Sequence, residues 1–190
     1  MTVDGRIVVV CTGNICRSPY IERRLRQALA RTSIAVTSAG TAALVGREMD
    51  PSSARLLVDA AADVDGFRAC QLTEEMVAGA DLVVTAAREH RTAASRLHPR
   101  ALRRTLTLMD LADLLDGVDP SVVSRTTSPA DGSWVARVVS CATSRRGVVS
   151  ARLEGVDIVD PVGGTMRDFR SMADQVERAL RSVVPVLGRA

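Results

Sequence analysis

Near its start the sequence has a short apolar stretch that passes through a small-residue turn directly into a helix. Residues 5–10 are mostly β-branched and apolar, and Thr12-Gly13-Asn14 follow as turn residues. Ser18-Pro19 then predicts a helix start, with the serine as N-cap and the proline as the first helical residue. A buried strand that enters a helix through so short a turn favours a sheet covered by helices.

The rest of the chain continues this alternation of strand and helix. Apolar runs predict further strands over 33–38, 80–85 and 105–109. Helical patterns begin at 50–51 and at 72–73, follow the third strand to about residue 97, and cover 133–146 and 168–184. Strands and helices at this spacing predict βαβ units in a parallel sheet, which is an α/β fold.

Glycine and proline interrupt the pattern in the segment 116–132, which contains Gly117, Pro120, Pro129 and Gly132. We predict a loop or linker there. No repeat or long low-complexity tract divides the chain. We therefore expect one domain over residues 1–190 that includes this segment.

Composition excludes several kinds of chemistry. All 25 basic residues are arginine, so mechanisms that need a Schiff-base or Walker A lysine are excluded. The two histidines, His90 and His98, are too few for a multi-histidine metal site, and we expect no metal and no cofactor. Aromatic residues make up 2% of the chain and offer few stacking surfaces, and the arginines alternate with acids, so we expect no nucleic-acid partner.

The apolar runs also bear on the compartment. None is long enough to span a bilayer, and no signal-peptide pattern is present. We expect a cytoplasmic protein with no membrane partner. The four cysteines are then expected to be thiols rather than a disulfide framework.

The predicted chemistry lies in the turn after the first strand, where Cys11 precedes Arg17 by six residues. Backbone N–H groups of the turn and of the following helix start converge there and form a site for an anion. The same positive field favours the thiolate form of Cys11, which is a nucleophile. Arg17 offers a planar fork to two phosphoryl oxygens, and Ser18 can hydrogen-bond the Cys11 sulfur. Gly13 allows the backbone to bend close to the ligand. We predict a phosphate-binding loop formed by Thr12, Gly13, Asn14, Ile15, Cys16, Arg17 and Ser18.

Residues 10–19, Val-Cys-Thr-Gly-Asn-Ile-Cys-Arg-Ser-Pro, resemble the phosphate-binding loop of low-molecular-weight protein tyrosine phosphatases. Further similarity lies at 38–41 (Ser-Ala-Gly-Thr), 71–73, 80–84 and 160–164 (Asp-Pro-Val-Gly-Gly). The resemblance implies three layers, a four-stranded parallel sheet with helices on both faces. It also implies a two-step hydrolysis of phosphate monoesters through a cysteinyl-phosphate, with inorganic phosphate as product.

The resemblance further implies that Asp160 is the general acid, which completes the expected catalytic set of Cys11, Arg17 and Asp160. A carboxylic acid there would protonate the leaving phenolate and then deprotonate the attacking water. Asp157 lies in the same stretch and is the alternative acid.

Three positions depart from the family pattern. Val162 stands where the family usually has an aromatic residue, residues 42–45 lack another aromatic, and Phe67 stands where the family commonly has a histidine. Aromatic side chains at the first two positions would enclose the phenyl ring of phosphotyrosine. We expect a phosphotyrosine-bearing protein as substrate, with a small phosphorylated molecule as the alternative.

The remaining cysteines leave other readings open. We expect Cys16 to be a redox partner that forms a disulfide with Cys11 under oxidation. Arsenate reductases share the implied fold and loop but use two further cysteines placed close together, whereas Cys70 and Cys141 lie 71 residues apart. A noncatalytic phosphate-binding module would not need the Cys11 thiolate. Both stay alternatives, and we expect a monomer or a weak dimer.

Overall fold

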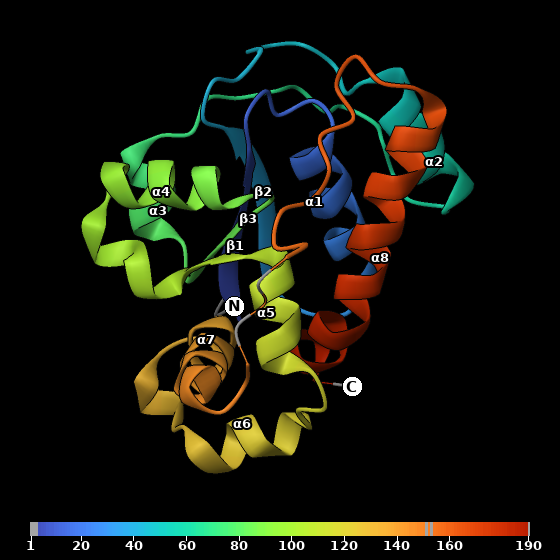
Figure 1. Cartoon of the computed structure of the whole chain (residues 1–190). Coiled ribbons are helices and arrows are strands. Elements are labelled where there is room, and N and C mark those ends of the chain that lie inside the picture. The colour runs from blue at the N-terminus through green and yellow to red at the C-terminus, as the bar shows by residue number, and fades with distance from the viewer. Residues whose placement is uncertain (1–3, 151, 153, 190) are drawn as a thin grey trace.

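The centre of the molecule is a four-stranded parallel sheet. The computed structural model describes residues 4–150, 152 and 154–189. The strands are β1 (Gly5–Cys11), β2 (Ile34–Gly40), β3 (Leu82–Thr85) and β4 (Thr105–Thr107), in the spatial order β2-β1-β3-β4. Every neighbouring pair is parallel (Figure 1). The predicted four-stranded parallel sheet is therefore confirmed.

Helices cover both faces of this sheet, because successive residues of β1 point to opposite faces. Ile7 and Val9 belong to the larger apolar cluster, which is closed by α1 (Arg17–Ala28), α2 (Pro51–Asp59), α5 (Leu108–Leu115), α7 (Trp134–Ser144) and α8 (Met166–Gly188). Val8 and Val10 belong to a smaller cluster, closed by α3 (Glu74–Gly79), α4 (Arg88–Leu97) and the 3₁₀ helix η1 (Pro99–Arg104). This arrangement matches the predicted three layers.

The register brings the carboxyl ends of three strands to one edge of the sheet. Cys11 pairs with Gly40, and Val10 pairs with Thr85. The segments that follow β1, β2 and β3 therefore meet there. Gly40 has no room for a side chain, because an added Cβ would lie 2.4 Å from the carbonyl oxygen of Thr12.

The segment 116–132 differs from the prediction of a loop. It contains α6 (Pro120–Thr126) and a 3₁₀ turn, η2 (Pro129–Asp131). The reason is local, because Asp119 accepts a hydrogen bond from the Ser121 amide and Pro120 is the first helical residue. Proline therefore starts a helix here rather than breaking one.

Smaller differences lie at element ends. β4 stops at Thr107 because its hydroxyl accepts from the Asp110 amide and caps α5. β2 runs to Gly40 rather than to residue 38, and α8 reaches beyond the predicted residue 184. The short 3₁₀ helix η3 (Arg145–Gly147) follows α7. No helix within the described residues has the length and apolar character needed to cross a bilayer.

Candidate active site

The loop between β1 and α1 is held by Ser18, which does not cap the helix. α1 begins at Arg17, with Cys16 at the N-cap position, so the predicted Ser18-Pro19 helix start is wrong. The Ser18 hydroxyl instead lies 2.9 Å from the sulfur of Cys11. It also accepts a 2.9 Å hydrogen bond from Asn14 Nδ2. The hydroxyl is therefore turned into the loop, where it can donate to the Cys11 sulfur.

Asn14 is the central brace of the loop. It is fully buried and has a φ of 54°, so the left-handed residue is Asn14 rather than Gly13. Its Nδ2 also donates to Ser38 Oγ at 2.9 Å, and its Oδ1 accepts from the Cys70 amide at 2.9 Å. Ser38 in turn donates to the buried carboxylate of Glu22. These contacts tie the loop to β2, to α1 and to the segment around Cys70.

The loop forms the floor of a pocket of about 240 Å³ that opens at the carboxyl edge of the sheet. Cys11 and Arg17 are 2% and 4% exposed, so both lie at its base. Arg17 Nη2 donates to Thr12 Oγ1 at 3.3 Å and to Asp160 Oδ2 at 2.6 Å. The pocket is lined by Cys11, Thr12, Gly13, Ile15, Cys16, Arg17, Ala42, Leu44, Asp160 and Val162.

The two aspartates of the late loop have different surroundings. Asp160 lies on the pocket wall, with its side chain about half exposed. Asp157 accepts instead from the backbone amide of Arg88 at 2.8 Å, at the first turn of α4. The amide of Ile158 donates to the carbonyl of Ala86 at 2.8 Å and anchors the loop to the end of β3. Only Asp160 of the two lines the pocket, 143 residues after Arg17 in the chain.

His90 is a site residue that the sequence analysis did not identify. It is 1% exposed, and its Nε2 lies 2.9 Å from Thr12 Oγ1. Burial and the nearby Arg17 guanidinium lower the pKa of His90, which favours the neutral ring. Its Nδ1 is buried without a partner among the described residues. An unpaired lone pair costs less than an unpaired N–H, so we place the ring proton on Nε2, from which it donates to Thr12.

A signal for His90 was present in the sequence. It lies five residues after the end of β3, in a segment that a parallel sheet brings to the same edge as the loop after β1. The loops after neighbouring parallel strands are where site residues gather, so a histidine there is a natural candidate.

The cysteines differ in their surroundings. Cys16 lines the pocket with Cys11, and burial together with Asp50 and Cys11 raises its pKa to about 12. Burial also raises the pKa of Cys70, whose thiol donates to the carbonyl of Ser38 at 3.1 Å. Cys141 belongs to α7 and is buried in the larger core.

The departures from the family pattern give the pocket aliphatic walls. Leu44 and Val162 line it and are 44% and 60% exposed, so they form the rim. Phe67 is buried in the larger core, and the Arg23 guanidinium lies 5.9 Å from its ring centre. Asn14 is therefore braced by serines and by the Cys70 amide, without a histidine.

Comparison with known proteins gives a consistent answer. The family model described as low molecular weight phosphotyrosine protein phosphatase matches residues 6–123. The EpsP protein of Ralstonia solanacearum, named a probable low molecular weight protein-tyrosine-phosphatase, is 41% identical over 93 residues, 49% of this chain and 63% of that protein. The Etp low molecular weight protein-tyrosine-phosphatase of Escherichia coli K12 is 36% identical over 100 residues, 53% and 66% of the two chains. The matched part thus spans just under two thirds of these relatives.

Solved structures extend the similarity to almost the whole length. The tyrosine phosphatase Wzb from Escherichia coli K30 in complex with sulphate is 26% identical, with a TM-score of 0.68, covering 97% of this chain and 99% of that one. The AmsI tyrosine phosphatase of Erwinia amylovora is 25% identical, with a TM-score of 0.68, covering 97% and 94%. With the family match over residues 6–123, this chain belongs to the low molecular weight phosphotyrosine protein phosphatase family.

Proposed function

We propose that the protein hydrolyses phosphate monoesters, with phosphotyrosine side chains of proteins as substrates. One observation carries the proposal. The Cys11 sulfur lies 2.9 Å from the Ser18 hydroxyl at the base of a pocket that also contains Arg17 and Asp160. A nucleophile, an anion-binding fork and a carboxyl group thus surround one small volume. The similar Wzb structure was solved in complex with sulphate, a tetrahedral oxyanion like phosphate, which supports an oxyanion ligand for this protein.

In the first step the Cys11 thiolate attacks phosphorus, and an S–P bond forms while the bond from phosphorus to the leaving oxygen breaks. The Arg17 guanidinium and the backbone N–H groups of the loop take up the charge on the phosphoryl oxygens. Asp160, in its protonated form, donates its proton to the leaving oxygen. The products of this step are the alcohol or phenol and a cysteinyl-phosphate.

In the second step water attacks phosphorus and the S–P bond breaks. Asp160, now a carboxylate, takes a proton from that water. The Ser18 hydroxyl donates to the departing Cys11 sulfur, which stabilises the thiolate. Inorganic phosphate leaves, and the thiolate is restored without a metal or an organic cofactor.

Thr12 adds a hydrogen bond at the phosphoryl group. Its hydroxyl oxygen accepts from Arg17 and from His90, so both lone pairs are occupied. The hydroxyl hydrogen is then free to donate to a phosphoryl oxygen. His90 and Arg17 act here as positioning residues for Thr12.

The depth of the pocket favours an aryl ester. Cys11 is almost inaccessible at the base, while Val162 is well exposed at the rim. A phosphoryl group has to stand on a long side chain to reach the sulfur, and a tyrosine ring supplies that length. Ile15, Ala42 and Leu44 provide apolar walls that would bury the ring at about 25 cal/mol per Å².

The alternative readings receive less support. For arsenate reduction, Cys70 is bonded to a backbone carbonyl and Cys141 lies in the core. A binding module has no use for a carboxyl group on the wall of the pocket. A small phosphorylated metabolite fits the same loop, and it is distinguished from phosphotyrosine by experiment.

The test is kcat/KM measured in parallel on a phosphotyrosyl peptide, a phosphoseryl peptide and a small alkyl phosphate. We expect the phosphotyrosyl peptide to be preferred by at least tenfold. A preference for the alkyl phosphate would replace the protein substrate by a metabolite. Turnover of arsenate with thioredoxin as reductant would replace hydrolysis by reduction.

The nucleophile is tested with Cys11→Ser, which should abolish hydrolysis while inorganic phosphate still binds by calorimetry. The anion site is kept in this variant because Arg17 and the backbone N–H groups remain. Cys141→Ala is the matched control, since it removes a thiol far from the pocket and should keep its activity. Turnover by Cys11→Ser within tenfold of the parent would refute the assignment.

A further inference from the structure

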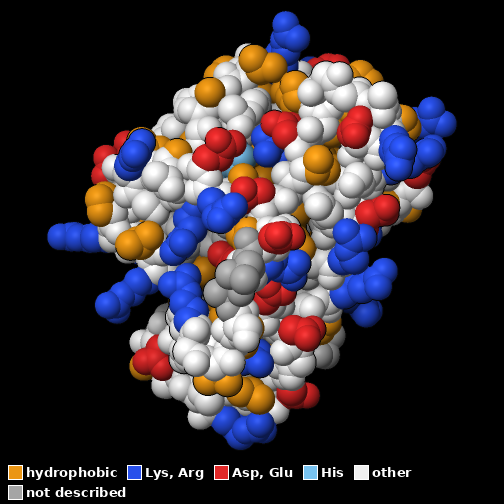
Figure 2. All heavy atoms as spheres, in the orientation of Figure 1, with side chains coloured by type: hydrophobic (Ala, Val, Ile, Leu, Met, Phe, Trp, Pro, Cys, Tyr) orange, Lys and Arg blue, Asp and Glu red, His pale blue; other side chains and the backbone are white. Residues whose placement is uncertain are grey.

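Arginines are concentrated on α4 and η1, beside the candidate active site. Residues 88–104 contain six arginines and one glutamate. Figure 2 shows a group of basic side chains on the face between α4 and α7. The proposed catalytic mechanism does not use these arginines.

Two adjoining depressions collect these side chains into one surface, which we call the arginine groove. The first, of about 680 Å³, follows α4, and the second, of about 280 Å³, lies between α4, α5 and the segment after α7. Arg91 lines both, so they lie next to each other. The charged residues of the arginine groove are Arg88, Arg91, Arg96, Arg146, Arg152, Asp110 and Asp113.

Only part of the positive charge is neutralised within the protein. Arg152 holds Asp113 with two hydrogen bonds of 2.8 and 2.5 Å, and Arg88 lies 3.6 Å from Asp157. In the part of the chain that the structure describes, no carboxylate forms an ion pair with Arg96 or Arg146. Five arginines against Asp110, Asp113 and Asp157 leave the groove positive.

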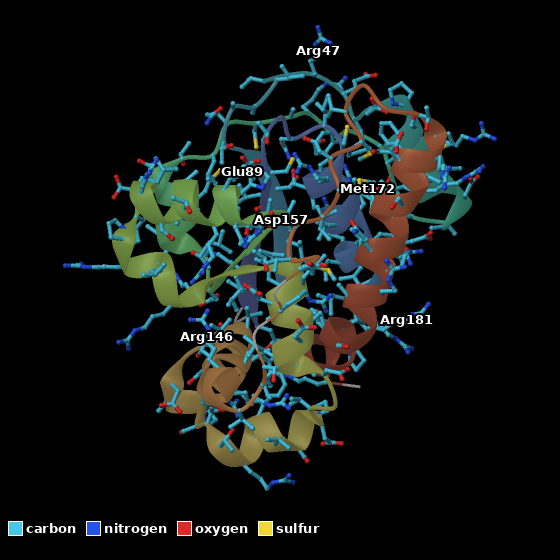
Figure 3. The ribbon with its side chains drawn as sticks, in the orientation of Figure 1. Arg47, Glu89, Arg146, Asp157, Met172 and Arg181 are labelled. Atoms are coloured by element: carbon cyan, nitrogen blue, oxygen red, sulfur yellow. The ribbon has the colours of Figure 1, made fainter. Side chains whose placement is uncertain are left out.

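The arginine groove lies beside the candidate active site. The Arg88 amide and side chain both contact Asp157, which lies three residues before Asp160 on the pocket wall. Figure 3 shows Asp157 and Arg146 on the same face. The ten residues of α4 span about 15 Å at 1.5 Å per residue, a length that about five residues of an extended peptide cover.

We propose that the arginine groove binds an acidic segment of the phosphorylated polypeptide, next to the residue that enters the pocket. The proposal rests on the proposed function and names the substrate class of that site. Carboxylates spaced along an extended chain match arginines spaced along one face of α4. A nucleic acid fits less well, because Asp110 and Asp113 interrupt the positive surface. Separate carboxylates of a peptide can be spaced to avoid these aspartates, whereas the regularly repeated phosphates of a nucleic acid cannot.

The experiment compares four phosphotyrosyl peptides of equal length. Two carry five glutamates on the amino or on the carboxyl side of the phosphotyrosine, and two carry glutamines instead. We expect the protein to prefer one of the glutamate peptides in kcat/KM, and added salt to reduce that preference. Arg96→Gln and Arg146→Gln should each lower kcat/KM for that peptide by about 1.5- to 5-fold, the range of exposed ion pairs.

Arg181→Gln is the matched control, since it removes the same charge from an exposed position on α8, away from the groove (Figure 3). It should leave the preference unchanged. The glutamine peptides and p-nitrophenyl phosphate should be hydrolysed equally well by all of these variants. An acidic preference that persists in the Arg96→Gln/Arg146→Gln double variant would overturn the proposal, as would equal rates on glutamate and glutamine peptides.

Two further outcomes keep the proposals separate. If the parent protein does not hydrolyse p-nitrophenyl phosphate, the proposed function is refuted, but the proposal on the arginine groove is not. The arginine groove can then be tested without hydrolysis, by fluorescence anisotropy with an unphosphorylated glutamate-rich peptide. Binding of this peptide would support the proposal, and no binding would overturn it. Tighter binding of a DNA oligonucleotide, with the same dependence on Arg96 and Arg146, would overturn the acidic-peptide proposal.

Discussion

Asp160 and Arg17 are in direct contact, although they come from opposite ends of the chain. Their 2.6 Å ion pair places the carboxyl group beside the fork that would hold the phosphoryl group. A proton donor in that position reaches the leaving oxygen only if the ester enters with its phosphoryl group on Arg17. The pair therefore links the binding of the anion to the transfer of the proton.

Asp160→Asn tests this link. The amide can still accept from Arg17 but has no proton to give at the leaving oxygen. We expect the rate of cysteinyl-phosphate formation to fall by about 10²–10⁴-fold for alkyl esters, and by much less for nitrophenyl phosphate, whose leaving group scarcely needs a proton. Single-turnover kinetics over a series of leaving groups measures the difference.

Asp157→Asn is the control, because its carboxylate accepts from the α4 backbone rather than lining the pocket. It should change the rates little and equally for all esters. An equal loss for every leaving group in Asp160→Asn would make Asp160 a structural residue.

His90 gives a prediction on stability against pH. Its pKa is lowered in the folded protein, so below about pH 6.5 the unfolded chain binds the proton more readily than the folded one. The free energy of unfolding should therefore fall as the pH drops from about 6.5 towards the folded pKa. In His90→Gln this fall should be smaller, as measured by urea unfolding at several pH values.

His98→Gln removes the other histidine of the chain and serves as the control. Half-buried and close to Glu74, His98 lacks the buried setting of His90. Parallel pH profiles for the parent and His90→Gln would show that His90 does not contribute to the acid sensitivity.

Cys16 gives a prediction on oxidation. Peroxide should convert the Cys11 thiolate to a sulfenic acid, and attack by Cys16 should then form a disulfide and release water. Because the pKa of Cys16 is about 12, its thiol has to lose a proton first, and the disulfide should form faster as the pH rises. Without Cys16 the sulfenic acid stays open to oxidation by a second peroxide to the sulfinic acid, which thiols do not reduce. After prolonged exposure to peroxide, dithiothreitol should therefore restore activity in the parent but not in Cys16→Ser.

Mass spectrometry of the oxidised protein identifies the linked pair. Cys70→Ser is the control and should recover as the parent does. A Cys11–Cys70 disulfide would contradict the prediction and favour a reductase-like exchange.

Among the strands and helices, β2 contributes to the site through its last residue, Gly40, which has no side chain. Gly40 pairs with Cys11, and the two segments that follow run side by side, with the Ala42 amide donating to the Thr12 carbonyl at 3.0 Å. Only a glycine permits this approach, because a Cβ would overlap the Thr12 carbonyl oxygen.

Gly40→Ala should therefore disturb both stability and activity. We expect a loss of about 1–3 kcal/mol in the free energy of unfolding, since backbone rather than a flexible side chain has to move. The shift of Thr12 should also lower kcat/KM on aryl phosphates. Gly147→Ala is the control, because a Cβ there meets nothing within 4 Å. Parent-like kcat/KM in Gly40→Ala would show that the loop tolerates the shift.

The elements also show what sequence reasoning could and could not supply. The strands, the Cys-x5-Arg loop and the parallel topology were predictable, because β-branched runs and turn residues act locally. The sequence indicates the contact of Ser18 with the Cys11 sulfur, but it also favours Ser18 as a helix cap, because nothing local reveals that Asn14 binds the same hydroxyl. His90 was missed because its contact with Thr12 depends on the order of the strands. Thr12 and His90 are 78 residues apart, so their contact is set by the packing of the fold and not by any local sequence pattern.

Across the molecule, the carboxyl and amino edges of the sheet differ in what they contribute. The carboxyl edge holds the pocket, while α7 and the end of α8 close the amino edge, where the Val135 amide donates to the carbonyl of Asp4 at 3.1 Å. Trp134 fastens these helices together. Its Nε1 donates to the carbonyls of Val186 and Leu187 at 3.1 and 3.0 Å.

Trp134→Phe should therefore affect stability without changing the chemistry. The lost donor leaves the carbonyls of Val186 and Leu187 without this partner, and we expect a loss of about 1–3 kcal/mol. For a chain of this size Tm falls by about 2–4 °C for each kcal/mol. Calorimetry measures the fall, and kcat/KM at 25 °C should stay within twofold of the parent. A larger kinetic effect would mean that the two edges are coupled.

The loop that carries Asp160 is fixed by its main chain, through the amide of Ile158, whereas its neighbour Val162 is largely exposed. An exchange at Val162 therefore leaves the acid in place. Substitutions at the rim, at Leu44 and Val162, should therefore alter substrate selectivity and leave the proposed catalytic residues in place. Directed evolution of selectivity should begin at these two positions.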